Sequence, residues 1–198
     1  MFTVEAPREP IAERLAALAE EARAGDREAL ELLLRELRPL VVRTARLVVG
    51  PGTWAAEDAA QEALLDVTLG VQGLRESAAV RAWALQLTVR RALKVARRER
   101  LRLLPMSKLD PELMPAQPGD ERREALRSAF AALPPRLRAV AALRLYVGLS
   151  ESETAAVMGR PVGTVKSQLN EARRRLAESL RVSGYRPITA PSEEDRNG

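Results

Sequence analysis

The chain contains no cysteine and no histidine, and aromatic residues make up only 3% of it. Without cysteine there is no disulfide and no thiol nucleophile, and without either residue the usual zinc sites are excluded. Histidine is also the most frequent general acid or base in enzymes. The clustered carboxylates Glu57, Asp58 and Glu62 have no partner motif for metal or phosphate chemistry. We therefore expect no metal, no cofactor and no enzymatic activity.

Long apolar runs are also lacking. No uninterrupted stretch approaches the roughly 18 apolar residues that a bilayer span needs. Residues 1–5 do not form a basic segment followed by an apolar core, so no signal peptide is expected. We expect a cytoplasmic protein without membrane insertion. Because 46% of the 198 residues are hydrophobic, the chain is able to bury a core in one or two domains.

The positive charge is unevenly distributed, although its sum is only +5. Residues 1–80 carry a net charge of −5, residues 81–102 a net charge of +7, and residues 121–181 a net charge of +6. Two separate positive blocks behind an acidic front half indicate two contacts with a polyanion.

Apolar residues recur at helical spacing along most of the chain, and no stretch alternates as a strand does. The expected helices span about 10–24, 27–49, 54–69, 77–102 and 120–147, with a pause at Pro134 and Pro135. Asp26, Thr53 and Ser77 are the expected N-caps. Prolines gather where the helical period stops. The predicted all-α organisation is a helical domain over 8–102, an irregular linker over 103–119, a second helical domain over 120–182 and a disordered tail over 183–198.

The segment 149–169 carries the most informative pattern. Ser150 and Glu153 form a capping-box pair at the start of a short helix. Gly159 permits a sharp turn, and Pro161 suits the entry to a second helix. A short capped helix, a glycine turn and a second helix that opens with small polar residues are typical of a helix-turn-helix. In that motif the second helix lies in the major groove of DNA.

The second helix of this motif separates into two faces. Its apolar stripe consists of Val165, Leu169, Ala172, Leu176 and Leu180. Short polar and cationic groups opposite and beside this stripe suit base edges and phosphates. An ordinary solvated helix face is the alternative interpretation. The candidate DNA contacts are Thr164, Lys166, Ser167, Gln168, Asn170, Glu171, Arg173 and Arg174.

These motifs together resemble the small, two-domain extracytoplasmic-function (ECF) sigma factors of bacterial RNA polymerase, over roughly residues 10–182. For the family's region 4, the resemblance rests on Leu-Ser-Glu at 149–151, the Gly159 turn and Val-Gly-Thr-Val-Lys-Ser at 162–167. For region 2, it rests on Ala-Gly-Asp-Arg-Glu-Ala at 24–29, Glu-Asp-Ala-Ala-Gln-Glu at 57–62 and Arg-Ala-Trp at 81–83. The order and spacing of these motifs make the combined signal specific.

The resemblance implies a role for each candidate site. The upstream, minus-thirty-five promoter element would be read by the helix over 162–180. The downstream, minus-ten element would be held by the basic helix through Arg81, Arg90, Arg91, Lys94, Arg97 and Arg98, because cations displace the counterions of phosphates. Core RNA polymerase would contact the face of Asp58, Gln61, Glu62 and Leu65. A solvated basic helix and an ordinary carboxylate pair are the plainer interpretations of the last two sites.

The chain departs from the family pattern at a few positions. Residues 65–70 lack the aromatic side chains that are usual there, and Gln168 replaces a common arginine. Trp83 fits a core anchor better than a base-stacking residue. An unstacked base is usually held by aromatic faces or by a shaped pocket. Pocket side chains and arginines are therefore expected to do more of this work here.

We predict a helical promoter-recognition subunit whose partners are core RNA polymerase and promoter DNA. An anti-sigma factor is a further expected partner, since such proteins often occlude both domains in this family. The main alternative is a stand-alone helix-turn-helix regulator with a sigma-like shape. Binding to core polymerase without DNA separates the two. A small enzyme on a helical bundle is disfavoured, because no catalytic constellation is present.

Overall fold

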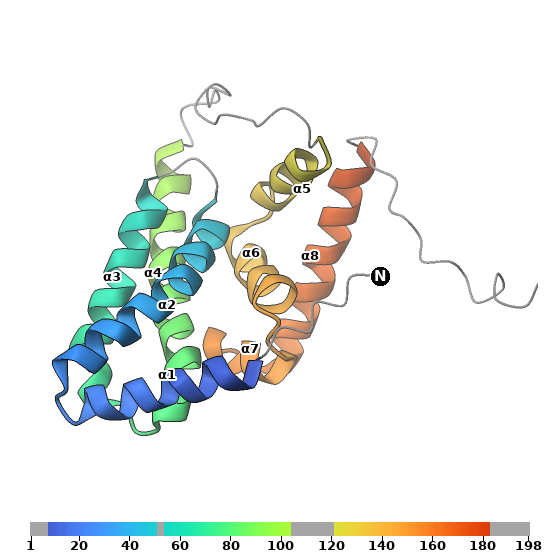
Figure 1. The fold of residues 1–198 in the computed structure, drawn as a ribbon. Coiled ribbons are helices and arrows are strands. Elements are labelled where there is room, and N and C mark those ends of the chain that lie inside the picture. Colours follow the sequence, from blue (N-terminus) through green and yellow to red (C-terminus); the bar gives the residue numbers. More distant parts are fainter. Residues whose placement is uncertain (1–7, 51–53, 104–120, 183–198) are drawn as a thin grey trace, which may run out of the picture.

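A computed structural model of the chain describes residues 8–50, 54–103 and 121–182. These residues form helices and short turns, with no β-strand among them, so the predicted all-α fold is confirmed (Figure 1). The α-helices are α1 (Arg8–Arg23), α2 (Arg27–Val49), α3 (Ala55–Gly70), α4 (Val80–Leu103), α5 (Glu121–Ala131), α6 (Pro135–Ala141), α7 (Glu151–Met158) and α8 (Val162–Val182). Two 3-10 turns, η1 (Val71–Gly73) and η2 (Ser77–Ala79), precede α4, and a π-helical turn, η4 (Ala142–Tyr146), follows α6.

Local capping interactions place several helix ends where the sequence predicts them. Asp26 accepts a hydrogen bond from the backbone N–H of Ala29 at 3.1 Å, which satisfies one free donor of α2. At α7, Ser150 and Glu153 complete the predicted capping box. Gly159 then adopts the left-handed conformation with φ 59°, which ends α7 at little steric cost.

The prediction that Ser77 caps the long basic helix is wrong. The α-helix begins at Val80, and the Ser77 hydroxyl donates instead to the carboxylate of Glu20 on α1. It also accepts from Arg23 Nη1 at 3.2 Å. These contacts lower the pKa of Glu20, through the Ser77 hydrogen bond first and then through the charge of Arg23. Thr53, the other expected cap, lies outside the described residues.

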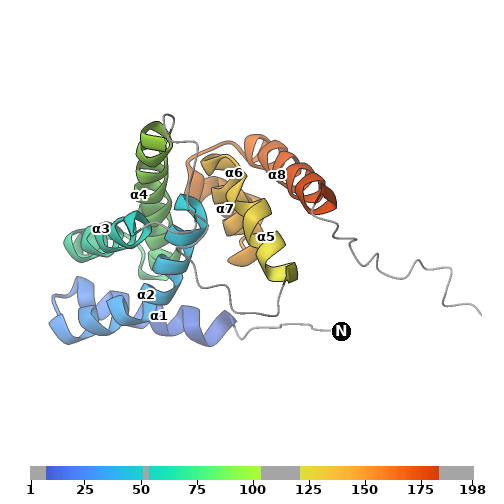
Figure 2. The same cartoon turned by 90° about the horizontal axis from the view of Figure 1, so that it is seen from above.

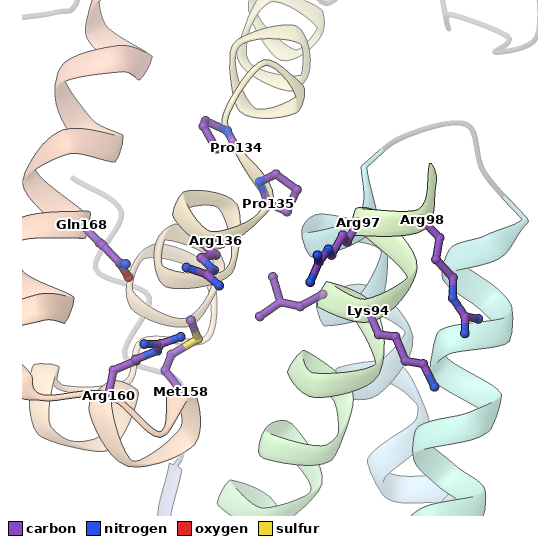
Figure 3. Close-up of a pocket in the computed structure, with 10 residues that line it drawn as sticks. Lys94, Arg97, Arg98, Pro134, Pro135, Arg136, Met158, Arg160 and Gln168 are labelled. Carbon is purple, nitrogen blue, oxygen red and sulfur yellow. The ribbon is translucent and has the colours of Figure 1, made fainter. Parts of the chain in front are cut away.

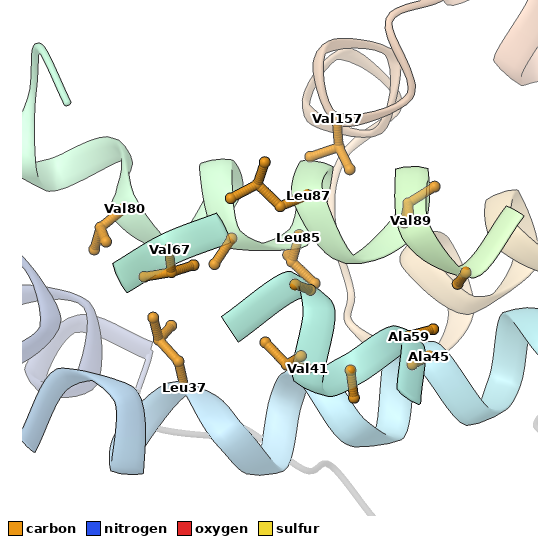
Figure 4. Packing of buried hydrophobic residues seen from close by; sticks show 14 of the residues in the cluster. Leu37, Val41, Ala45, Ala59, Val67, Val80, Leu85, Leu87, Val89 and Val157 are labelled. Carbon is orange, nitrogen blue, oxygen red and sulfur yellow. The ribbon is translucent and has the colours of Figure 1, made fainter. Parts of the chain in front are cut away.

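The front half of the chain is a bundle in which α2, α3 and α4 pack on one another and α1 lies across them (Figure 1). The facing surface of α3 is built from alanines, including Ala59 and Ala63, both fully buried. Small side chains let the helix backbones approach closely, and larger ones such as Leu37 and Val41 fill the remaining space (Figure 4). This packing fixes which face of α3 points outward.

The two predicted domains share one hydrophobic core. Figure 2 shows α1–α4 on one side and α5–α8 on the other, with α6 and α7 next to α2 and α4. Ala139, Leu143 and Val157 belong to the same buried cluster as Leu87 of α4 (Figure 4). The second half also has smaller clusters of its own, between α5, α6 and α8 and around Val165. The halves therefore meet through apolar contact, which the sequence does not indicate.

A buried arginine joins the halves. Arg138 of α6 is only 8% exposed, and its guanidinium donates to the backbone carbonyl of Val49 at 2.9 Å and to that of Ala131 at 2.9 Å. These carbonyls end α2 and α5, and a cation is favourable at helix C-termini. Burial lowers the pKa of Arg138, but a guanidinium stays protonated in proteins. Arg43 adds a second link by donating to the Tyr146 hydroxyl at 2.8 Å.

The predicted domain boundaries fall close to helix ends. Leu103, placed at the start of the predicted linker, is the last residue of α4, and α5 begins at Glu121. The rest of the linker over 103–119 and the tail over 183–198 lie outside the described residues. Within the described segments, none of the helices combines the length and hydropathy that a membrane span requires.

Candidate nucleic-acid and polymerase interface

The second helix of the predicted helix-turn-helix, α8, presents the two faces that its sequence period predicts. Val165, Leu169, Ala172 and Leu176 are buried, and Leu180 packs at the edge of the same core. The other faces are open to solvent: Lys166, Ser167, Asn170, Arg173 and Arg174 are exposed, and Thr164, Gln168 and Glu171 are partly exposed. The helix is therefore oriented to meet a ligand with its polar side chains.

Two of these polar residues, Glu171 and Arg174, are engaged with each other and with Arg175 along the helix. Arg174 makes a bidentate pair with Glu171, at 3.0 Å from Nε and 2.9 Å from Nη2, and Arg175 Nε approaches the same carboxylate at 2.6 Å. Hydrogen bonds from Arg174 and then from Arg175 lower the pKa of Glu171 to about 2. A base contact by Arg174 must therefore compete with an existing carboxylate partner.

Two of the candidate arginines on the basic helix α4 are already paired with carboxylates of α3. Arg91 donates to Asp66 at 2.7 Å from Nε and at 2.5 Å from Nη2, and to Glu62 at 2.9 Å. Arg90 lies 3.5 Å from Asp66. The hydrogen bond from Arg91 is the main cause that lowers the pKa of Asp66. Arg91 thus has a structural role that the sequence pattern does not reveal, and it also orients Glu62, a candidate polymerase contact.

Three cations toward the end of α4 have no such partner among the described residues. Lys94, Arg97 and Arg98 are exposed and form no ion pair with the part of the chain that the structure describes. They line a cleft of about 760 Å³ with residues of the second half, including Arg160 and Gln168 (Figure 3). Arg81, the remaining candidate for the downstream element, lies in the first turn of α4, and its side chain is partly exposed. The structure thus brings three predicted downstream contacts and one predicted upstream contact, Gln168, to one cleft.

The candidate polymerase face of α3 is exposed as a unit. Asp58, Gln61, Glu62 and Leu65 all point away from the alanine-rich core side, and Leu65 is 59% exposed. One turn further on, Leu69 is 84% exposed, although sequence reasoning did not select it. Its helical spacing from Leu65 is the signal that could have found it. An apolar pair beside carboxylates is suited to a protein partner better than to DNA.

A small pocket lies in the turns between α3 and α4. Its walls include Gly70, Leu74, Arg75 and Trp83, and its volume is about 480 Å³. Trp83 also packs against the main core, as expected of an anchor. A Cβ atom at Gly70 would lie 2.9 Å from the Trp83 ring, so only glycine fits there without displacement. The tryptophan therefore supports the core and lines the pocket at once.

Comparison with known families agrees with this division of the chain. Residues 33–102 match the family described as Sigma-70 region 2, and residues 123–176 match Sigma-70, region 4. Both regions belong to sigma-70 proteins, the promoter-recognition subunits of bacterial RNA polymerase. The chain is 35% identical to the ECF RNA polymerase sigma factor SigD of Mycobacterium tuberculosis over 186 residues, which cover 87% of this chain and 86% of SigD. The chain belongs to the ECF family of RNA polymerase sigma factors.

Other relatives and solved structures agree. The RNA polymerase sigma-E factor of Streptomyces coelicolor is 30% identical over 156 residues, which cover 76% of this chain and 85% of that protein. The sigma factor RpoE of Bartonella quintana, solved with the anti-sigma factor NepR, has a TM-score of 0.62 and 25% identity, covering 77% of this chain and 96% of that one. CnrH, solved with the cytosolic domain of CnrY, shares the fold with a TM-score of 0.62 at 21% identity, covering 85% of this chain and 98% of that one.

Family membership settles the general function. As a sigma factor, the protein binds core RNA polymerase and directs promoter recognition and transcription initiation, and it is not itself an enzyme. The alternative of a stand-alone regulator is thereby disfavoured.

Proposed function

We propose that α8 reads the upstream promoter element in the major groove. One observation carries this assignment. Helix α8 follows the capped helix α7 and the left-handed Gly159, and it buries its apolar face while its polar face stays exposed. Ser167 and Asn170 are placed for base edges, while Lys166 and Arg173 are placed for phosphates.

Contact with the downstream element is assigned to the C-terminal part of α4, from Lys94 to Arg98. Lys94, Arg97 and Arg98 are the proposed phosphate contacts, because their charges have no carboxylate partner among the described residues. Arg90 and Arg91 contribute less in this proposal, since α3 already engages them. The pocket beside Trp83 offers a shaped site for an unstacked base next to residues 65–70, which lack aromatic side chains.

The proposed contact with core polymerase is the α3 face of Asp58, Gln61, Glu62 and Leu65, extended by Leu69. Exposed leucines beside carboxylates provide both apolar area and charge, as protein interfaces do. Glu62 is shared with Arg91, so Asp58 is the cleaner position to change.

The experiment compares the affinity of the full chain for core RNA polymerase, without DNA, between the parent and Asp58→Lys with Leu65→Ala. We expect at least about tenfold weaker binding, which corresponds to about 1.4 kcal/mol. The control is Glu21→Lys, the same charge reversal on an exposed residue of α1. Equal affinities for a helical double variant and the parent would overturn the assignment of this face.

An anti-sigma factor is proposed as a regulatory partner, since two solved structures of similar fold are complexes, one of them with a named anti-sigma factor. We also propose that the protein acts in the cytoplasm, where core RNA polymerase and promoter DNA are found. Co-purification from cells with core polymerase in the soluble fraction tests the second statement.

A further inference from the structure

A cleft lies between the halves, and its lining includes Leu93 and Arg97 of α4, Arg136 of α6, and Met158, Arg160 and Gln168 of the helix-turn-helix. Its volume of about 760 Å³ lies within the range of small-molecule pockets. Figure 3 shows Arg97 on one wall facing Arg136 and Arg160 on the other, while Lys94 and Arg98, which also line the cleft, extend along the outer side of α4. The guanidinium groups of Arg97, Arg136 and Arg160 therefore face one space from both halves.

The charge of these three arginines is not compensated within the described residues. No carboxylate lines the cleft, and none of the three forms an ion pair there. Other exposed arginines behave differently: Arg91 and Arg174 are both held by carboxylates. Like charges gathered in one cleft raise its positive potential and favour the binding of an anion.

The other lining groups indicate what else the anion carries. Leu93 and Met158 supply apolar surface inside the cleft. Gln168 also lines the cleft, and the N–H₂ group of its side-chain amide is a hydrogen-bond donor of the kind that phosphate oxygens accept. Guanidinium groups bind phosphate oxygens in a planar, two-bond geometry that a compact polyphosphate presents repeatedly.

We propose that the cleft binds a compact polyphosphate anion, inorganic or carried by a nucleoside, between Arg97 on one side and Arg136 and Arg160 on the other. Such a ligand contacts both halves, so it stabilises the arrangement in which they are packed together. The ligand also occupies Arg97 and Gln168, which are candidate DNA contacts, so we expect it to compete with promoter DNA; this expectation rests on the proposed function. Anion binding itself does not depend on DNA recognition.

The test measures thermal unfolding of the full chain with sodium tripolyphosphate or adenosine triphosphate, without divalent metal and at constant ionic strength set with sodium chloride. We expect a saturable rise in Tm. The apparent Kd should be about tenfold weaker in Arg97→Gln and in Arg160→Gln, because each loses a charge-assisted contact. The matched control is Arg38→Gln, the same charge change on an exposed residue of α2 outside every proposed site.

The two ligands distinguish the source of the phosphate. Tighter binding of adenosine triphosphate indicates a nucleotide whose base uses the apolar wall, whereas equal binding indicates an inorganic polyphosphate. The proposal is overturned if sodium chloride alone gives the same rise in Tm, if the rise does not saturate, or if Arg38→Gln weakens it as much as Arg97→Gln.

A second readout follows the two halves directly. Because the chain has no cysteine, dyes are attachable at Gln86→Cys on α4 and Ala177→Cys on α8, both exposed. Tripolyphosphate should shift the energy-transfer distribution toward the close arrangement in the parent and not in an added Arg97→Gln variant. An unchanged distribution in the parent would contradict the bridging role. A parent chain that binds the anion but does not bind promoter DNA would count against the promoter assignment alone.

Discussion

At the residue scale, the polar side chains of α8 divide into those that are free and those already paired. Lys166 is exposed and has no ion pair with the described residues, whereas Arg174 shares Glu171 with Arg175. The sequence gives the outward direction of all of them, because helical period alone determines it. Which of them are paired depends on side-chain rotamers, and the sequence pattern does not specify these.

Lys166 and Arg174 should therefore differ in their effect on DNA binding. Lys166→Ala is expected to weaken binding to all upstream sequences similarly and to lower the salt slope by about one unit, as for a phosphate contact. If Arg174 exchanges Glu171 for a bidentate pair with guanine, Arg174→Ala is expected to cost about 1–3 kcal/mol at one base position and to relax preference there. Affinities on matched and mismatched elements at two salt concentrations measure both effects. If both variants bind every element as the parent does, α8 is not the recognition helix.

The Glu171 carboxylate should titrate far below an ordinary glutamate. Its pKa is about 2 in the folded chain, lowered by Arg174 and Arg175 from an ordinary value of 4.5. A lowered folded pKa means that the pairing stabilises the fold above pH 4.5 and that this contribution is lost as the pH falls toward 2. Carboxyl NMR titration should show a midpoint near 2 that returns toward 4.5 in Arg174→Ala with Arg175→Ala. A parent midpoint near 4.5 would show that the pairs are not formed in solution.

At the scale of the helices, ends set by local contacts agree with the sequence, while ends set by distant contacts do not. The Ser150–Glu153 box and the Gly159 turn need only neighbouring residues, so their pattern is sufficient. Ser77 fails as a cap because its hydroxyl bonds to Glu20, which is 57 positions away. The same limit hides Arg91, whose carboxylate partners lie on another helix.

Arg138 should be important for the stability of the helices that it joins. Arg138→Met leaves the terminal carbonyls of α2 and α5 without this donor, and we expect unfolding to become easier by about 1–3 kcal/mol. Urea denaturation followed by circular dichroism measures the change. Arg38→Met, at an exposed position of α2, should shift the midpoint little. Equal small shifts in both variants would mean that Arg138 does not support the contact between the halves.

At the scale of the whole molecule, the structure adds an arrangement that the sequence does not predict. Proline spacing indicates where the halves separate along the chain, but their packing depends on apolar contacts between residues far apart, such as Leu87 with the cluster of Val157 and Leu143. In this arrangement the C-terminal part of α4 and the helix-turn-helix border one cleft. The proposed contacts for two promoter elements therefore lie close together in this arrangement.

Transcription by core RNA polymerase in vitro, with and without the full chain, over a library of promoter sequences, tests the central claim most directly. The account predicts transcripts that depend on the chain and that start at a fixed distance from two sequence elements, an upstream one sensitive to changes in α8 and a downstream one sensitive to Lys94 and Arg98. Binding of the chain to DNA from the library without any chain-dependent transcript would contradict the account.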